Sequence, residues 1–225
     1  MRRFDEVHTS GELVSLVERI GFLPFFRCPI PGFSLAECTP PELWFTEKEG
    51  PWEWKGQAAR TKRVCYGKFF RGKAVYVSLE WLPDFLNYRR DGYDFDALWD
   101  DELVSAREKF LYDTVSEHGS ILSGDLKKEC NYRKDGNKGF DTLITRLQMR
   151  GYVAVEDFPY AKDKAGNAYG WGIARYATPE HIFGPDLVRS AYSRDPAESM
   201  ARIVGHLGSI LPDVGEKAIL SLLKF

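Results

Sequence analysis

The sequence predicts an α+β fold in which helices and a β-hairpin follow one another in the second half of the chain. Apolar residues recur at helical spacing in three segments between 103 and 150. Residues 152–157 alternate in polarity like a strand, and residues 67–78 are rich in aromatic and β-branched side chains, as hairpins are. With 44% hydrophobic and 28% charged residues, the composition is that of an ordinary globular protein.

The N-terminal portion is expected to combine helices with a hairpin. The stretch Thr9-Ser10-Gly11-Glu12 reads as a capping box that starts a helix, and Gly21 ends that helix. Prolines keep residues 24–41 irregular, and a short helix is expected over 41–46. Arg71-Gly72 is a plausible turn in the hairpin over 67–78. A soft domain boundary falls between 88 and 96.

Three helices and two strands are expected after that boundary. The first helix ends at Gly119, and its apolar face consists of Leu103, Val104, Phe110, Leu111 and Val115. Ser123 caps a second helix, which ends near residue 131, and a third runs over 138–150. Strands over 152–157 and 170–176 flank a polar loop over 160–169.

This order of elements is the winged-helix pattern, a helix-turn-helix followed by a β-hairpin wing. The segment TLITRLQMRGYVAVED resembles the junction between the last helix and the wing in winged-helix DNA-binding proteins. We therefore expect an aromatic- and basic-rich α/β portion over 1–95, a winged-helix domain over 96–184 and a C-terminal helical tail over 185–225. The tail reads as two amphipathic helices that close the core or form a dimer contact.

Several function classes lack their sequence signals. No apolar run of 18 residues predicts a membrane span, and the N-terminus lacks the apolar core of a signal peptide, so a cytoplasmic location is expected. The four cysteines, at 28, 38, 65 and 130, form no CxxC pair, which argues against zinc. Phosphate-binding glycine loops are also missing, so we expect neither a metal nor a cofactor.

The third helix of the second half is the candidate DNA-recognition element. In helix-turn-helix proteins this helix enters the major groove of double-stranded DNA. Lys138, Thr142 and Thr145 lie opposite its apolar face, and Arg146 lies beside them. Two further lysines, Lys162 and Lys164, fall on the expected wing tip. A solvated charged face and a protein–protein module are the alternatives, and Asp141 argues mildly against contact with DNA.

A second candidate surface is a basic and aromatic stretch over 50–73. From Lys55 to Lys73 there are seven Lys or Arg and no acid, in a chain of net charge −2. The cations expected to contact phosphates are Lys55, Arg60, Lys62, Arg63, Lys68 and Arg71, and the rings that could stack on bases are Trp52, Trp54, Tyr66 and Phe69. In the alternative interpretation these rings belong to the core, residues 52–54 form a strand, and the cations pair with the acid-rich stretch 84–102.

Two carboxylates are candidates for catalysis. Glu53 lies between two tryptophans, where it could act as a general acid or base, and Asp84 follows the hairpin. Enzymes that act on bases extrude the base and hold it between rings, so a carboxylate beside tryptophans suits that chemistry. The spacing of Glu53 and Asp84 does not itself require this role.

Four segments together carry a family resemblance. GFLPFF, GPWEWKGQ, YGKFFRGKAVYVSLEW and the winged-helix pattern resemble the AlkZ-related proteins, which are similar to part of the AlkZ/YcaQ-type winged-helix DNA glycosylases. The resemblance implies tandem winged helices that form a concave DNA-binding face. It also implies removal of alkylated or crosslinked bases without a metal, so damaged DNA is the expected partner.

The sequence departs from those glycosylases at their catalytic motif, which is Gln-x-Gln or Gln-x-Asp. Gln57 and Gln148 are the chain's two glutamines, and neither has Gln or Asp two residues later. Three hypotheses therefore stay open: a glycosylase-like repair protein that recognises damaged bases, a DNA-binding transcriptional regulator without catalysis, and a protein–protein adaptor.

Overall fold

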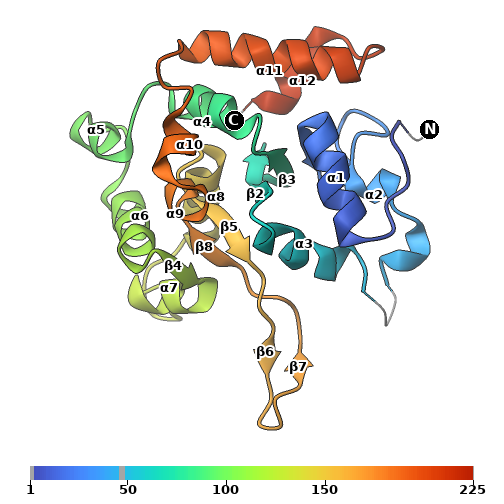
Figure 1. The fold of residues 1–225 in the computed structure, drawn as a ribbon. Coiled ribbons are helices and arrows are strands. Elements are labelled where there is room, and N and C mark those ends of the chain that lie inside the picture. Colours follow the sequence, from blue (N-terminus) through green and yellow to red (C-terminus); the bar gives the residue numbers. More distant parts are fainter. Residues whose placement is uncertain (1–2, 46–48, 225) are drawn as a thin grey trace.

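The computed structural model describes residues 3–45 and 49–224, and its elements are shown in Figure 1. The first half contains α1 (Ser10–Ile20), β1 (Phe22–Pro24), α2 (Leu35–Cys38), the 3-10 turn η1 (Pro41–Leu43), α3 (Pro51–Arg60), β2 (Val64–Phe70), β3 (Lys73–Ser78) and α4 (Leu82–Arg90). The second half contains α5 (Phe95–Asp100), α6 (Ala106–His118), β4 (Ser120–Leu122), α7 (Ser123–Glu129), α8 (Phe140–Met149), β5 (Ala154–Asp157), β6 (Ala161–Lys162), β7 (Ala168–Tyr169), β8 (Arg175–Ala177), α9 (Pro179–Phe183), α10 (Pro185–Arg189), α11 (Pro196–Ile210) and α12 (Glu216–Leu223).

One antiparallel sheet joins the two halves of the chain. Its strand order is β1-β3-β2-β5-β8-β4, so three strands from residues before 96 lie beside three strands from residues after it. Tyr66 of β2 and Val155 of β5 form the pair that connects the halves. The mixed fold with an antiparallel sheet is therefore confirmed. The division at 95/96 stays a prediction, and the sheet runs across it without a break.

The expected local signals form the first helix and the hairpin. The Thr9 hydroxyl accepts a hydrogen bond from the backbone N–H of Glu12, and α1 ends before Gly21, whose φ is 81°. β2 and β3 pair around a two-residue turn at Arg71-Gly72. Of the predicted short helix over 41–46, residues 41–43 form η1, and Thr46 lies outside the described residues.

Residues 52–54 form part of a helix, so the alternative of a strand there is wrong. Pro51 occupies the first turn of α3, where its missing N–H costs no hydrogen bond. The Glu53 carboxylate accepts a 2.9 Å hydrogen bond from the backbone N–H of Gly50 and caps the helix. The two tryptophans consequently point in different directions, with Trp54 in the core and Trp52 partly exposed.

The predicted helix that ends at Gly119 begins later than expected. The Ser105 hydroxyl and the Glu108 carboxylate form a capping box, and α6 therefore starts at Ala106. Leu103 and Val104 precede this helix, and the Phe110 side chain is 52% exposed and does not face the core. Apolar spacing alone did not separate this helix from α5, which lies just before it.

The C-terminal tail closes one end of the core. Helix α11 packs along α4, and α12 follows beside α11, so both cover the top of the molecule in Figure 1. At the opposite end the paired strands β6 and β7 project as an arm between β5 and β8 (Figure 1). The predicted polar loop over 160–169 is thus partly a short hairpin. No helix in residues 3–45 and 49–224 has the length and apolar character to cross a membrane.

Candidate nucleic-acid interface

The tip of the β2–β3 hairpin packs against α8 and shapes the candidate interface. The backbone N–H of Lys68 donates to Oε1 of Gln148 over 3.0 Å, and the Lys68 amine donates to the Thr145 hydroxyl over 3.3 Å. Arg71 and Gly72 have φ values of 52° and 71°, and positive φ at both central residues is the conformation of a type I′ turn. Gly72 also permits the close approach, because a Cβ atom there would lie 3.2 Å from Cγ2 of Thr145.

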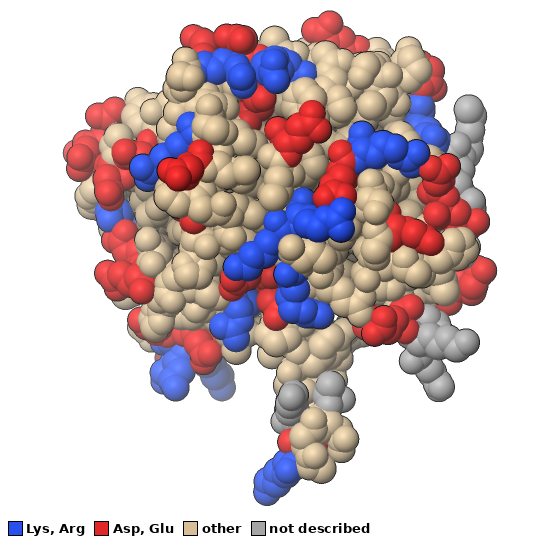
Figure 2. All heavy atoms as spheres, in the orientation of Figure 1, with Lys and Arg blue, Asp and Glu red and all other residues tan. Residues whose placement is uncertain are grey.

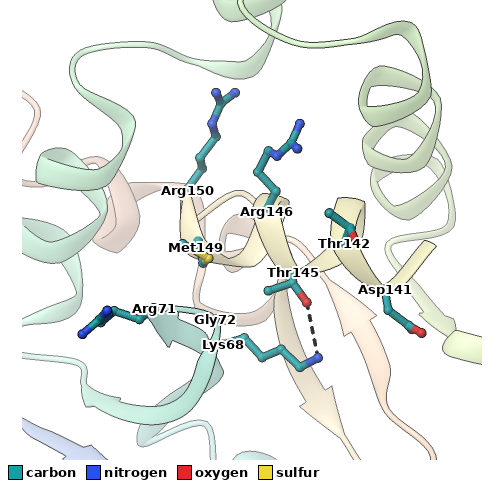
Figure 3. A pocket seen from close by; sticks show the side chains of 9 residues that line it. All are labelled: Lys68, Arg71, Gly72, Asp141, Thr142, Thr145, Arg146, Met149 and Arg150. Atoms are coloured by element: carbon teal, nitrogen blue, oxygen red, sulfur yellow. Dashed lines mark hydrogen bonds between the residues drawn. The ribbon is translucent and has the colours of Figure 1, made fainter. Parts of the chain in front are cut away.

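A hollow of about 720 Å³ lies between this hairpin tip and α8. We call it the basic groove, and Lys68, Arg71, Gly72, Asp141, Thr142, Thr145, Arg146, Met149 and Arg150 line it. Figure 3 shows Arg146 and Arg150 extending from α8 while Arg71 extends from the hairpin. The one acid of the lining, Asp141, points away from these cations in Figure 3 and lies 3.5 Å from the Lys127 amine. The groove is therefore suited to an anionic partner.

A second hollow continues the basic groove along the start of α8. It has a volume of about 590 Å³ and is lined by Ser105, Ala106, Arg107, Lys138, Gly139, Thr142 and Leu143. Thr142 belongs to both hollows. The structure thus places Lys138, which precedes α8, and Thr142, Thr145 and Arg146 of α8 along two hollows that share Thr142. Arg146 also pairs with Glu108 over 3.2 Å.

An aromatic cavity of about 340 Å³ opens on the other side of Lys68 and Gly72, which line both it and the basic groove. Its lining residues are Phe26, Trp52, Tyr66, Lys68, Gly72, Lys73, Ala74, Gln148, Val155, Phe158, Ala174 and Tyr176. Five of these twelve residues are aromatic, and the buried side-chain amide of Gln148 adds a polar group. A flat, partly polar ligand matches that wall.

Three polar side chains of this cavity, Trp52, Tyr66 and Tyr176, are neutral groups that can form hydrogen bonds. The indole N–H of Trp52 is buried and has no hydrogen-bond partner among the described residues. Burial raises the pKa of Tyr66, and it raises the pKa of Tyr176 to about 12, so both phenols are neutral near pH 7. A buried donor without a partner costs free energy, which a ligand acceptor would recover.

Four of the predicted phosphate-binding cations lie away from the basic groove. Arg60 pairs with Asp157 over 2.6 Å, Lys62 approaches Glu156 at 3.9 Å, and Arg63 donates to Glu18 over 2.8 Å. Lys55 is buried beneath two rings. Figure 2 shows that basic and acidic side chains alternate over this face of the molecule.

The alternative that these cations pair with the acid-rich stretch 84–102 is wrong, because their acidic partners lie elsewhere in the chain. Glu18, Glu156 and Asp157 lie outside that stretch and supply the carboxylates. Within the stretch, Asp84 pairs with Arg194 and Arg202, and Asp96 lies 3.6 Å from the Lys109 amine. These contacts could not be predicted from proximity in the sequence. They depend on the fold, which places β5 beside α3.

The predicted aromatic residues divide between cavity and core. Trp52 and Tyr66 line the aromatic cavity, as base stacking would require. Trp54 is 1% exposed and Phe69 is fully buried, so neither ring has a free face for a base in this structure. Helical geometry explains the difference between the tryptophans, because residues two apart on a helix face different directions.

The two predicted catalytic carboxylates lie in different surroundings. Glu53 caps α3 and accepts a 3.2 Å hydrogen bond from the Tyr160 hydroxyl, next to Trp52 of the aromatic cavity. Asp84 is buried between α4 and α11, where Arg194, Arg202 and the Ser199 hydroxyl donate to it. The structure does not bring the two carboxylates together, and the contacts of Asp84 are those of a structural ion pair. Catalysis by either stays a prediction.

The two predicted wing lysines belong to the projecting arm. Lys162 lies in β6, and Lys164 lies in the exposed turn at the tip. The base of the arm carries Trp171, which is 68% exposed and lies 5.6 Å from Trp52 between ring centroids. The arm therefore begins beside the aromatic cavity.

Sequence reasoning missed several residues of these hollows. Arg107 and Arg150 line the basic surface, while Phe158, Tyr176 and Gln148 line the aromatic cavity. Arg150 follows Met149 in the last turn of α8, so helical spacing from Arg146 could have indicated it. The cavity residues come from β5, β8 and α8, and only the sheet order brings them together. In the described part of the chain, no three His, Cys, Asp or Glu side chains are grouped to hold a metal.

Comparisons with known proteins identify one matching family. The family model described as AlkZ related matches residues 7–224. Among solved structures, the chain is similar to the Streptomyces sahachiroi DNA glycosylase AlkZ, with a TM-score of 0.49 and 12% sequence identity. The match covers 92% of this chain and 54% of that one, so this chain spans about half the length of that enzyme. No curated protein gives a significant match.

Proposed function

The chain belongs to the AlkZ-related family, and we propose that it binds double-stranded DNA and recognises a damaged base in it. The observation that carries the proposal is the junction at Lys68 and Gly72, where the basic groove meets the aromatic cavity. A cationic groove suits the phosphate backbone, and a ring-lined cavity beside it suits one base taken out of the helix.

The basic groove would hold the DNA backbone. Lys68, Arg71 and Arg150 have no ion pair to an acid among the described residues, so their charges are available to phosphates. Arg146 would exchange its 3.2 Å contact with Glu108 for a phosphate. Because such contacts release counterions, the affinity would fall steeply with salt.

We interpret α6, α7, α8 and the β5–β8 arm as a winged helix. In this interpretation α8 is the helix that enters the major groove, since its residues Thr142 and Thr145, and Lys138 just before it, line the two hollows. The arm between β5 and β8 is the wing, and its exposed Lys164 would contact the backbone or the minor groove. Figure 1 is consistent with this role, because the arm projects well beyond the body of the protein.

The aromatic cavity would receive the damaged base. Trp52, Tyr66 and Phe158 offer ring faces or edges to a flat base, and stacking of this kind contributes roughly 1–3 kcal/mol per base. The unpaired indole N–H of Trp52 could donate to a ring nitrogen or carbonyl of the base. A base with an added alkyl group would gain further apolar contact with Val155 and Ala174.

Cleavage of the glycosidic bond is the part of the proposal that depends on a carboxylate. Glu53 is the better placed of the two candidates, because it neighbours Trp52 and its other contact, Tyr160, lies at the start of the arm. It would stabilise the positive charge that develops on the sugar. Glu53→Gln keeps the hydrogen-bond acceptor for Gly50 and removes the charge. An excision assay tests this role. Wild type is expected to release alkylated bases, and Glu53→Gln is expected to release none.

A DNA-binding protein without catalysis is the second candidate function. It is favoured by the absence of a Gln-x-Gln or Gln-x-Asp motif and by the capping contact that occupies Glu53. The two functions differ in product and not in binding. If the protein binds DNA without catalysis, DNA with one alkylated base would keep that base after incubation with excess protein.

The proposal is tested by binding to two fluorescent duplexes that differ at one position. One carries an abasic-site analogue opposite an unpaired base, and the other is fully paired. The proposal expects tighter binding of the first duplex, because its unpaired base leaves the helix at a lower free-energy cost. Equal affinity would contradict recognition of extruded bases, and no binding to either duplex would contradict DNA binding and favour a protein partner.

A further inference from the structure

A further hollow adjoins the tip of the β2–β3 hairpin, and the proposed function gives it no role. It has a volume of about 300 Å³, and we call it the α12 cavity because Leu222 of α12 forms part of its wall. Arg71 lines both this cavity and the basic groove, whereas Phe26 and Lys73 line both this cavity and the aromatic cavity. Ligand pockets in proteins occupy roughly 300–1,000 Å³, so the α12 cavity has the size for a small molecule.

Apolar side chains form most of the wall of the α12 cavity. They are Pro24, Phe26, Pro29, Phe70, Val75 and Leu222. Pro24, Phe70, Val75 and Leu222 are buried, and they belong to β1, β2, β3 and α12, so regular elements hold them in place. The wall therefore suits the hydrocarbon body of a ligand.

The Cys28 thiol adds no charge to this wall. It is half-buried, and its Sγ donates to the carbonyl oxygens of Ile30 and Phe33 over 3.4 Å and 3.3 Å. Burial raises the pKa of this thiol, so it is uncharged near pH 7. Apart from three cations, the residues that line the cavity therefore offer no free side-chain donor to a ligand.

The three cations of the α12 cavity gather there without a carboxylate. Arg27, Arg71 and Lys73 are exposed, and no residue that lines the cavity is acidic. Within residues 3–45 and 49–224, none of the three forms an ion pair. A guanidinium group donates to both oxygens of a carboxylate at once, so an organic anion matches this set of charges.

We propose that the α12 cavity binds a small organic acid, whose hydrocarbon body packs on the apolar wall and whose carboxylate contacts Arg27, Arg71 and Lys73. The inference goes beyond the proposed function and does not depend on DNA binding. A nucleotide also combines a ring with an anion. The polar edge of its base, however, would lose hydrogen bonds to water without finding side-chain partners on the described wall. The ligand class is therefore an alkyl or aryl carboxylate.

Methyl NMR of the full chain tests the inference with three probes that share a phenylalkyl body. Phenylbutyrate, phenylbutanol and phenylbutylamine carry an anionic, a neutral and a cationic head. The reporters are the methyl groups of Val75 and Leu222 in the cavity wall. Phenylbutyrate is expected to shift both sets of signals to saturation and to bind at least about fivefold more tightly than phenylbutanol. Phenylbutylamine is expected to bind more weakly than phenylbutanol.

Two variants test the role of the cations. Arg27→Gln and Lys73→Gln alter exposed side chains, so the fold is expected to persist. Each should weaken phenylbutyrate binding by about twofold to fivefold and leave phenylbutanol binding unchanged. Arg63→Gln is the matched control, because Arg63 pairs with Glu18 and does not line the cavity, and it should bind phenylbutyrate as wild type does.

Three results would overturn the inference. They are no shift of either methyl reporter with phenylbutyrate, equal affinity for phenylbutyrate and phenylbutanol, and unchanged phenylbutyrate affinity in both variants. Thymidine monophosphate that binds this cavity as tightly as phenylbutyrate would also overturn it, because the occupant would then be a nucleotide. These measurements contain no DNA, so their outcome is separate from that of the proposed function.

Discussion

The backbone N–H of Lys68 donates a 3.0 Å hydrogen bond to Oε1 of Gln148, and this bond fixes the β2–β3 hairpin against α8. Gln148 is buried, and its amide nitrogen donates in turn to the carbonyl oxygen of Ile144. The hairpin comes from the first half of the chain and α8 from the second. The basic groove therefore exists only because these two distant segments are held together.

Replacing Gln148 by leucine is expected to destabilise this junction. The leucine side chain has a similar size but no acceptor, so the partly buried N–H of Lys68 would lose its partner. An unsatisfied buried donor costs about 1–3 kcal/mol of free energy of unfolding. Urea denaturation of Q148L checks this loss. Unchanged stability would show that the hydrogen bond does not hold the hairpin to α8.

Gly72 is expected to matter for the shape of the groove as well as for its turn. Gly72→Ala adds a Cβ atom 3.2 Å from Cγ2 of Thr145, and its φ of 71° disfavours a side chain. Gly92→Ala is the matched control, since Gly92 has a φ of 81° and nothing within 4 Å of the added atom. Both variants should lose about 1 kcal/mol of stability from the positive φ. DNA affinity should fall for Gly72→Ala alone, and equal affinity of the two variants would argue against the close approach to α8.

Asp84 is expected to stabilise the protein by holding α11 to α4. Asp84→Asn keeps the size of the side chain and removes the charge that faces Arg194 and Arg202. Because both arginines are partly exposed, the expected loss is about 1–3 kcal/mol, below that for a fully buried pair. Asp96→Asn, which alters an exposed pair with Lys109, should change stability by less than about 1 kcal/mol. Similar losses for both variants in chemical denaturation would contradict this assignment.

Trp52 is expected to govern the preference for damaged DNA. Trp52→Leu removes the ring and the indole N–H from the aromatic cavity but leaves the basic groove unchanged. The preference for the duplex with the abasic-site analogue should weaken by about 1–3 kcal/mol, and affinity for paired DNA should change little. Trp99→Leu is the control, because Trp99 is exposed on α5 and lines neither hollow. A preference that survives Trp52→Leu would place base recognition elsewhere.

Local signals predicted much of the fold. Thr9, Gly21 and the Arg71-Gly72 turn act within a few residues of themselves, and the structure has the corresponding elements where they were expected. Residues 52–54 form a helix and not a strand because Pro51 favours a helix start, whereas the alternation of two tryptophans is also compatible with a helix. The capping box at Ser105 sets the start of α6, whereas apolar spacing alone extends that helix back to Leu103.

The candidate site was less accessible to sequence reasoning than the fold. Helical geometry predicted Thr142, Thr145 and Arg146 as outward residues, and the structure places them on α8, whereas Lys138 precedes the helix, which begins at Phe140. The partners of Arg60, Lys62 and Arg63 depend on which strands and helices lie side by side, and a count of charges along the chain could not show that. The aromatic cavity draws on five separate parts of the chain, so it required the sheet order β2-β5-β8.

The salt dependence of DNA binding by Arg71→Ala tests the central claim most directly. Arg71 lines the basic groove, whereas Arg63 is paired with Glu18 on α1, so Arg63→Ala is the matched control. Fluorescence anisotropy of a paired duplex over a series of salt concentrations gives the slope of log affinity against log salt. The account predicts that Arg71→Ala binds more weakly and reduces this slope by about 1, as expected for one lost phosphate contact, while Arg63→Ala keeps the wild-type slope. Equal slopes for wild type and Arg71→Ala would show that DNA does not occupy the basic groove.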